Sequence, residues 1–307
     1  MLVVSVGNLN FDIYLRAGGI PGPDERVEAL ELYTGGGGSA ANFALAIARM
    51  GLRARFIGAV GDDPLGEMSL MELAAGGVDV SRVKRVHGVP SGIVVVIVDE
   101  SGVKRMLAYR GANALLAPED LTPEKFEGAR HVHVATGRVE IIKRAGGLAR
   151  EAGASLSVDG GMALAGRGLE RLREALGSAD VAFFNYAEAR AATGLDDPER
   201  IVEALSAGLR VGEVVVTLGA GGAIASDGRR TVRVPAIRAA AVDTTGAGDS
   251  FAAAYVAALL RGADMRERLA FASAAAAIKV SRRGARSSPS YDEVVSLLRS
   301  LGYTAKI

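Results

Sequence analysis

The chain has 307 residues, of which 49% are apolar and 23% are charged, and its formal net charge is +1. This composition is typical of a folded globular protein, and the charge gives no reason to expect binding to nucleic acid or to an anionic membrane. The absence of cysteine excludes disulfides, thiolate catalysis and thiolate metal sites.

The first predicted element is a buried strand at 2–6, bounded by Gly7. Asn10 and Asp12 follow it, and the carboxyl ends of strands are where an open α/β sheet binds its ligands. Binding of a ligand is one interpretation of these two side chains. A turn capped by their own side chains is the other.

Two segments do not look like parts of the central sheet. Residues 13–32 are predicted to form strand, Pro/Gly turn and strand, and residues 91–109 form a hairpin around a Gly-containing turn at 99–102. Together they predict a small antiparallel sheet beside the main one, made of about 11–36 and 90–112.

Four consecutive glycines, Gly35 to Gly38, lead into a helix predicted at 40–50. Glycines let the backbone approach a ligand closely, and Asn42 in the first helical turn can bond to a hydroxyl. A hinge is the alternative role of the glycine loop, and the two roles are compatible.

Strands and helices alternate through the rest of the chain. Strands are predicted at 54–60, 131–135, 155–158, 181–184 and 213–218, and helices at 65–75, 139–152, 169–176, near 187, 198–207, 247–260 and 266–280. This order predicts a single α/β domain over 1–307, with a mostly parallel central sheet and helices on both faces. His131 and His133 share one face of a strand, but no third ligand is evident nearby, so we interpret them as ordinary histidines rather than a metal site.

Two motifs follow strands in the second half of the chain. Asn185 and Glu188 have the spacing of a helix N-cap with a capping-box glutamate, which would explain the pair without a ligand. The strand at 214–218 runs into a glycine-rich turn at 219–222. That turn is neither a Walker A motif nor a dinucleotide-binding fingerprint, because the residues each requires do not follow it.

The segment 243–249, Asp-Thr-Thr-Gly-Ala-Gly-Asp, precedes an Ala-rich helix. Gly246, Ala247 and Gly248 leave backbone N–H groups bare at the helix start, where the positive end of the dipole favours an anion such as phosphate. Asp249 is placed to orient or deprotonate a hydroxyl aimed at phosphorus, and the dipole should keep it ionised. The pattern predicts phosphoryl transfer. A tight turn with a favourable Asp–dipole contact is the structural alternative.

The segment 243–249 resembles the second signature of the ribokinase-like (PfkB) carbohydrate kinases. Residues 37–44 resemble the first signature, with Gly51 and Gly61 at the family's spacing. The two signatures lie far apart and in the family's order, and the resemblance extends from Gly7 to Ser288. It implies a ribokinase-like fold in which the small sheet is a lid over a sugar site and, in several relatives, pairs two subunits.

The resemblance also implies roles for individual residues. The implied substrate ligands are Asn10, Asp12, Gly37, Gly38, Asn42 and Asp249. The implied nucleotide contacts, some of them through Mg²⁺, are Asn185, Glu188, Thr217, Gly219, Gly222 and Gly248. The implied ligands of a monovalent cation, usually K⁺, are Asp243, Thr245, Lys279, Arg282, Gly284 and Ser288, with a solvated basic turn as the alternative for 281–288.

The predicted activity is therefore transfer of the γ-phosphoryl group of ATP to a hydroxyl of a small sugar, with Asp249 taking the proton and the amides of residues 246–248 stabilising the transferred group. Ribose is put in doubt by Ser39, which stands where typical ribokinases have lysine, and by Ala135-Thr136-Gly137, where they place a carboxylate. Fructose, a ketodeoxy sugar acid, another polyol and a nucleoside stay open. A non-catalytic sugar-binding sensor is the alternative from another class, and a nicotinamide dehydrogenase lacks a supporting fingerprint.

Nothing in the sequence predicts a membrane protein. The longest apolar stretches, 251–260 and 269–278, are too short to span a bilayer, and the N-terminus has no signal-peptide pattern. A cytoplasmic protein is expected, with ATP and a sugar-like molecule as partners, and a homodimer formed through the lid is a further expectation.

Overall fold

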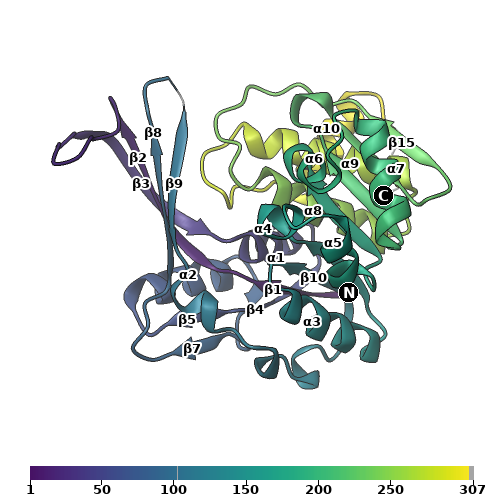
Figure 1. Cartoon of the computed structure of the whole chain (residues 1–307), viewed down its shortest axis with the longest axis horizontal. Helices are drawn as coiled ribbons and strands as arrows, with labels where there is room; N and C mark the ends of the chain where they lie inside the picture. The colour runs from purple at the N-terminus through teal and green to yellow at the C-terminus, as the bar shows by residue number, and fades with distance from the viewer. Residues whose placement is uncertain (102, 304–307) are drawn as a thin grey trace.

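The computed structural model describes residues 1–101 and 103–303, and a nine-stranded sheet forms its centre (Figure 1). The strands, in their order across the sheet, are β15 (Thr231–Val234), β14 (Ala223–Ser226), β13 (Glu213–Thr217), β12 (Val181–Asn185), β11 (Ser155–Asp159), β10 (Ala129–Ala135), β1 (Leu2–Gly7), β4 (Arg53–Ile57) and β6 (Val78–Asp79). Neighbours from β13 to β6 pair in parallel, whereas β14 and β15 are antiparallel. The predicted α/β fold with a mostly parallel sheet is confirmed.

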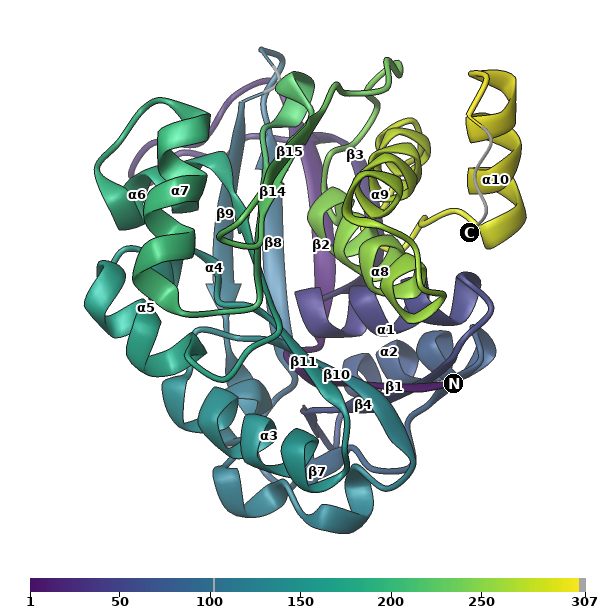
Figure 2. The same ribbon diagram turned by 90° about the vertical axis from the view of Figure 1, so that its right-hand side faces the viewer.

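Helices cover both faces of this sheet (Figure 2). On one face lie α1 (Ser39–Arg49), α2 (Pro64–Ala75), α8 (Ala247–Leu260), α9 (Met265–Val280) and α10 (Tyr291–Ser300). On the other lie α3 (Val139–Glu151), α4 (Gly161–Ala165), α5 (Leu169–Leu176), α6 (Tyr186–Thr193) and α7 (Pro198–Leu209). Because successive side chains of a strand point to opposite faces, Val3 of β1 joins the first core and Val4 and Val6 join the second.

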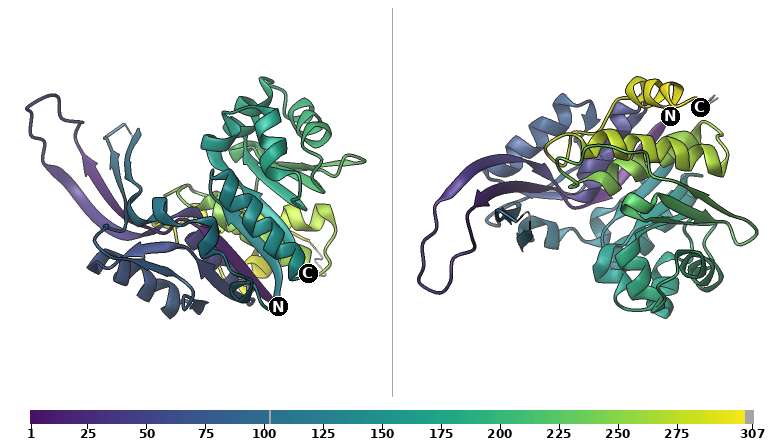
Figure 3. Two further views of the ribbon diagram at one scale, coloured as in Figure 1. Left: turned by 60° about the horizontal axis from the view of Figure 1, so that its bottom comes forward. Right: turned by 90° about the horizontal axis from the view of Figure 1, so that it is seen from above.

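A four-stranded sheet, here called the projecting sheet, stands away from this body (Figure 3). Its strands, in order, are β3 (Ala29–Gly37), β2 (Asn10–Ala17), β8 (Gly92–Val98) and β9 (Lys104–Tyr109). The small sheet expected from the sequence is present, although its central pair, β2 and β8, is parallel rather than antiparallel. The predicted glycine loop is in part wrong, because Gly35 to Gly37 belong to β3 and pair with β2.

Other boundaries differ from the prediction for local reasons. The strand expected at 54–60 is broken at Gly58, where a Cβ atom would lie 2.4 Å from the Phe56 ring and 2.7 Å from the Gly7 carbonyl oxygen. The second half becomes β5 (Ala59–Gly61), which pairs with β7 (Lys84–Val86). The elements that were not predicted are short or terminal: α4, α10, β6, β7, β14, β15 and the 3₁₀ turns η1 (Gly111–Leu115), η2 (Pro118–Asp120), η3 (Pro123–Lys125) and η4 (Gly219–Gly221).

The two histidines of β10 are part of the core. The ring of His131 contacts the hydroxyls of Ser155 and Ser157, both at 2.7 Å, and that of His133 contacts Ser157 at 2.8 Å and stacks on Phe43. Burial lowers the pKa of His131 to about 3 and that of His133 well below its ordinary value. Their interpretation as ordinary histidines is confirmed. Within the described ranges, no helix combines the length and apolar character needed to cross a bilayer.

A buried ion pair joins the sheet to α8 and α9. Arg268 donates two hydrogen bonds to the Glu213 carboxylate, at 2.7 and 3.0 Å, and the Tyr255 hydroxyl donates a third at 2.7 Å. The Arg268→Met variant leaves a largely buried carboxylate without its counter-charge, so we expect the free energy of unfolding to fall by about 3 kcal/mol. Urea denaturation measures this change. Arg233→Met, which removes a surface pair with Glu199, is the control and should change stability by less than about 1 kcal/mol.

Candidate active site

The functional candidates gather where the parallel strands end. Gly7 of β1 lies beside Ala135 of β10, which lies beside Asp159 of β11, and Asn185 of β12 lies beside Thr217 of β13. All five positions are therefore at the carboxyl edge of one sheet, where open α/β folds bind their ligands. The start of α8 and the first residues of β2 complete this edge.

The anion loop, residues 243–249, ends in the first turn of α8. Gly246 has φ +77° and is the N-cap, and a Cβ atom there would lie 2.2 Å from the Ala285 carbonyl oxygen, so only glycine fits. The amide of Ala247 donates to the Thr244 carbonyl at 3.2 Å, whereas the amides of Gly246 and Gly248 have no partner among the described residues. Three free backbone N–H donors were predicted, and the structure leaves two of them free, because the N–H of Ala247 is bonded within the turn.

Asp249 lies within this first turn and contacts the other signature. Its Oδ2 accepts a hydrogen bond from Asn42 Nδ2 at 2.8 Å, and the hydroxyl of Ser39 also bonds to this carboxylate. Burial raises the pKa of Asp249 to about 6, against the lowering effect of these two bonds. The group was expected to be ionised at the positive end of the helix dipole, and a pKa of about 6 is compatible with that expectation. At neutral pH the group is mostly ionised and is a stronger base than an exposed aspartate.

Arg286 orients Asn42. Its Nε donates to Asn42 Oδ1 at 3.3 Å, a second nitrogen donates to the Gly37 carbonyl at 3.0 Å, and a third pairs with Glu72 at 2.6 Å. With its oxygen engaged by Arg286, the Asn42 amide points its nitrogen at Asp249. Arg286 is buried, so the alternative of a solvated basic turn is wrong at this residue. Sequence reasoning did not find this role, and a buried arginine between two signatures is visible only in the fold.

Asp12 offers a free acceptor to a ligand. Its Oδ1 is buried without a hydrogen-bond partner among the described residues, and its Oδ2 accepts from the Tyr14 hydroxyl at 3.3 Å. Burial raises the pKa of Asp12 to about 6. Buried polar atoms are nearly always satisfied, so this oxygen fits a donor supplied by a ligand, such as a sugar hydroxyl.

Asn10 is held by a residue that the sequence analysis did not place in the site. Asn113 in η1 donates from Nδ2 to Asn10 Oδ1 at 2.9 Å, and bonds to both the N–H and the carbonyl of Leu9. The nitrogen of Asn10 is left to donate. Asn10 and Asp12 lie within β2, opposite Gly37 and Gly35, so the capped-turn alternative is wrong.

The two raised carboxyl pKa values predict the pH dependence of activity. As pH falls through about 6, Asp249 is protonated and can no longer accept a proton, so kcat/KM should decline on the acid side. In the Ser39→Ala variant a bond that favours the charged form is lost, and we expect this limb to move up by about half a pH unit. Initial rates from pH 5 to 8 measure it. In Tyr14→Phe, Asp12 loses the hydrogen bond that lowers its pKa, so the acid limb of the pH profile should also move. An acid limb that is unchanged in both variants would contradict the assignment.

Asn185 and Glu188 form the capping box that was one of their two interpretations. Glu188 Oε2 accepts from the Asn185 N–H at 2.9 Å, and Asn185 Oδ1 accepts from the Glu188 N–H at 2.9 Å. The other carboxylate oxygen of Glu188 has no partner among the described residues and stays available. Gly219 has open space around it, whereas Gly222, with φ +92°, is required by a close approach to the Val234 carbonyl.

Asp159 is a candidate that sequence reasoning missed. It ends β11, one residue beyond the predicted strand, and its burial, together with the charges of Glu188 and Asp249, raises its pKa to about 8. Asp159 could have been found from the sequence by applying the rule that located Asn10, that polar residues at the carboxyl ends of strands are candidate ligands. In the described part of the chain no three His, Cys, Asp or Glu residues are close enough to bind a metal directly. Mg²⁺ carried by nucleotide phosphates needs no such protein cage, and Asp159 and Glu188 are acidic side chains at this edge of the sheet.

The predicted ligands of a monovalent cation are engaged by the protein itself. The carboxylate of Asp243 accepts from the N–H and hydroxyl of Thr245 at 3.0 and 2.8 Å, and from the Gly284 N–H at 3.0 Å. Two groups of the projecting sheet complete its shell, the Tyr33 hydroxyl at 3.3 Å and Lys104 Nζ at 3.2 Å. These hydrogen bonds outweigh burial and lower the pKa of Asp243 to about 2.

Lys279 is one of the implied cation ligands, and its own side chain enters this region. The Nζ atom donates to the Asp243 carbonyl at 2.7 Å and to the Arg282 carbonyl at 3.5 Å, and the residue is fully buried. Burial lowers its pKa, against the charges of Asp243 and Asp249. The residues at these positions therefore do not fit K⁺.

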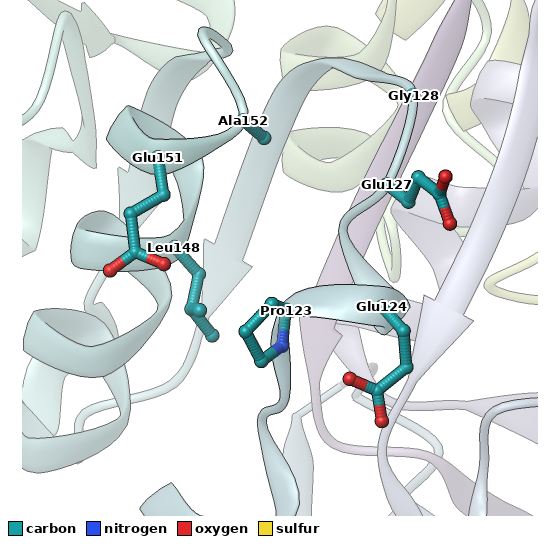
Figure 4. A pocket seen from close by; sticks show the side chains of 7 residues that line it. All are labelled: Pro123, Glu124, Glu127, Gly128, Leu148, Glu151 and Ala152. Carbon is teal, nitrogen blue, oxygen red and sulfur yellow. The ribbon is translucent and has the colours of Figure 1, made fainter.

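A separate pocket lies at the other end of the strands (Figure 4). It is formed by the segment before β10 and the C-terminal end of α3, and its lining residues include Pro123, Leu148, Glu124, Glu127 and Glu151. None of the predicted site residues lines it. Its position, away from the carboxyl edge, separates it from the candidate active site.

Similarity to known proteins agrees with this geometry. The family model described as pfkB family carbohydrate kinase matches residues 1–291. An ATP-dependent ribose-1-phosphate kinase of Halopiger xanaduensis is 34% identical over 96% of this chain and 97% of its own length. A nucleoside kinase of Methanothermobacter thermautotrophicus is 33% identical over 92% of this chain and 90% of its own length. The structure of Arabidopsis thaliana ribokinase, complexed with ribose and ATP, is similar with a TM-score of 0.86, 32% identity and coverage of 97% of this chain and 98% of that one. The chain thus belongs to the pfkB family of carbohydrate kinases, as its two signatures predicted, and is a kinase with the ribokinase fold.

Proposed function

We propose that the protein transfers the γ-phosphoryl group of ATP to a hydroxyl of a small sugar derivative, with Asp249 as the group that positions this hydroxyl. The acceptor oxygen forms a bond to the γ-phosphorus while the bond from that phosphorus to the ADP oxygen breaks, and the hydroxyl proton passes to Asp249. The free amides of Gly246 and Gly248 stabilise charge on the transferred group. The Asn42–Asp249 bond at a helix N-terminus is the observation that carries this proposal.

The nucleotide is proposed to lie along the ends of β12 and β13, near Asn185, Glu188, Thr217 and Gly219. Mg²⁺ neutralises charge on the nucleotide phosphates when it is bound. The open space around Gly219 and the free oxygen of Glu188 support this placement. We also propose a cytoplasmic location, where both ATP and Mg²⁺ are plentiful.

We propose a ribose ring substituted at its anomeric carbon as the acceptor. The relatives from Halopiger xanaduensis and Methanothermobacter thermautotrophicus are named for ribose 1-phosphate and for nucleosides, which share that feature. Asn10 and the unpaired oxygen of Asp12 offer a donor and an acceptor to neighbouring ring hydroxyls. Ser39 bonds to Asp249, so the position where ribokinases have lysine serves the carboxylate here.

Release of ADP tests both the activity and the acceptor. The panel contains ribose, ribose 1-phosphate, fructose, a 2-keto-3-deoxy sugar acid, adenosine and cytidine, each with ATP as donor, read by release of ADP, or with ADP as donor, read by release of AMP. We expect the highest kcat/KM with a 1-substituted ribose and ATP. A sugar that binds in calorimetry without any turnover would instead support the sensor, and turnover of unsubstituted fructose alone would contradict the acceptor class.

We further propose that the projecting sheet is a lid that pairs two copies of the chain. Its edge strands expose large apolar side chains, including Met106 and Leu107 of β9, which are 71% and 75% exposed, and Leu32 of β3. Such exposed apolar side chains are typical of an interface. Leu107→Glu should convert a dimer into a monomer in light scattering after gel filtration. Met71→Glu, at an exposed residue of α2, is the control, and a wild-type monomer at high concentration would contradict the proposal.

A further inference from the structure

We infer that the ammonium of Lys279 is a built-in replacement for the monovalent cation that the family resemblance implies, and that the enzyme works without K⁺. The residue closes α9, and its Nζ reaches two carbonyls of the region where that cation was expected, those of Asp243 and Arg282. An ammonium group carries the same single positive charge as K⁺. It donates hydrogen bonds to oxygen atoms, and oxygen atoms are also what coordinate K⁺.

The ammonium is held in place from several sides. Both backbone N–H groups of Val242 and Asp243 donate to the Val280 carbonyl, at 2.7 and 3.1 Å, so the anion loop is tied to the residue that follows Lys279. The N–H of Arg282 donates to the Lys279 carbonyl at 3.0 Å, which closes the turn around the side chain. The charge of Lys279 is therefore fixed beneath the loop by the helix that carries it.

The remaining oxygens expected around a cation have protein donors. The Gly284 carbonyl accepts from the Ser287 hydroxyl at 2.8 Å, and the Ser288 carbonyl accepts from Arg49 at 2.6 Å. The Thr245 hydroxyl and the Asp243 carboxylate are bonded to each other and to Lys104. A potassium ion needs oxygens that replace its hydration shell, and the oxygens named here already accept hydrogen bonds from the protein.

The charge of Lys279 acts on the same groups that a bound ion would influence. Asp243 and Asp249 are both within its electrostatic reach, and Asp243 begins the anion loop. A fixed cation here offsets the two carboxylates near the incoming phosphate without an exchangeable ion. The position of the loop should then be independent of the salt in the medium.

The experiment compares KCl with tetramethylammonium chloride at constant ionic strength. Three quantities are measured for each protein: the thermal unfolding midpoint, the Kd for MgATP by calorimetry, and the rate of ADP release. For the wild type we expect less than a twofold change in rate and Kd and less than about 1 °C in the midpoint. A saturable rise of severalfold with K⁺ in the wild type would overturn the inference.

Variants of Lys279 test whether its ammonium occupies a cation position. Lys279→Ala opens space, so we expect at least a tenfold loss of MgATP affinity in tetramethylammonium chloride and partial, saturable recovery with K⁺ or NH₄⁺. Lys279→Met fills the space without charge and should lose the same affinity without recovery. Lys84→Ala is the control, because Lys84 forms an ion pair with Asp120 away from this region. A folded alanine variant that is unaffected, or that neither ion restores, would overturn the inference.

Two outcomes need separate treatment. If the alanine variant does not fold in tetramethylammonium chloride, the wild-type comparison and recovery of its folding by K⁺ still decide the question. If no acceptor gives ADP release, the proposed acceptor is wrong, but the unfolding midpoint and the Kd for MgATP still test the role of Lys279.

Discussion

Replacing Asp249 by asparagine is expected to lower kcat by about 1,000-fold, within the range found for loss of a positioned acid or base. Asparagine has the same shape and can still accept the Asn42 hydrogen bond, so the first turn of α8 should keep its geometry. It cannot take the proton of the acceptor hydroxyl. The loss should therefore appear in kcat, whereas the Kd of MgATP should change little.

Single-turnover rates and calorimetry separate these two effects. Asp292→Asn is the matched control, because Asp292 is also an acid in the first turn of a helix, α10, but is exposed and lies outside the site. Its rate should equal that of the wild type. Retention of more than a few per cent of wild-type kcat by Asp249→Asn would show that another group receives the proton.

The second large effect is expected from Gly246→Ala. The new Cβ atom would lie 2.2 Å from the Ala285 carbonyl oxygen, and φ is +77°, so the anion loop has to shift. Because a small misplacement of reacting groups costs about 100-fold in rate, we expect at least this loss in kcat together with a lower unfolding midpoint. Initial rates and thermal unfolding measure the two changes.

Gly248→Ala is the companion variant that separates packing from function. A Cβ atom at Gly248 meets nothing within 4 Å, so the unfolding midpoint should stay the same or rise slightly. If the open space beside this residue receives the phosphoryl group, the methyl group should lower kcat by about 10-fold. Wild-type turnover in Gly248→Ala would place the phosphoryl group elsewhere.

The contact between the two signatures could be predicted in outline from the sequence. Asn42 and Asp249 are 207 positions apart, yet both were singled out because each lies in the first turn of a helix that follows glycines, and the structure joins them by one hydrogen bond. The strand-end rule similarly located Asn10 and Asp12. These residues lie close together because local patterns determine helix starts and strand ends, and a parallel sheet brings those ends to one edge, whereas their roles toward a substrate stay predictions.

The roles of Lys279 and Arg286 could not be predicted in this way. A backbone carbonyl oxygen can come from any residue type, so the resemblance at Lys279 said nothing about its side chain. Whether a long cationic side chain turns inward depends on what surrounds it: Lys279 meets the Asp243 carbonyl and Arg286 meets Asn42. Such neighbours come from distant parts of the chain and leave no local pattern.

The contacts of Asp243 have a consequence for how the enzyme will respond to mutation. Tyr33 and Lys104 connect two strands of the projecting sheet directly to the first residue of the anion loop. The projecting sheet, which contains Asn10 and Asp12, is thus hydrogen-bonded to the loop that faces the phosphate. Changes at its outer edge should consequently alter turnover as well as acceptor affinity, although they lie far from the reacting atoms.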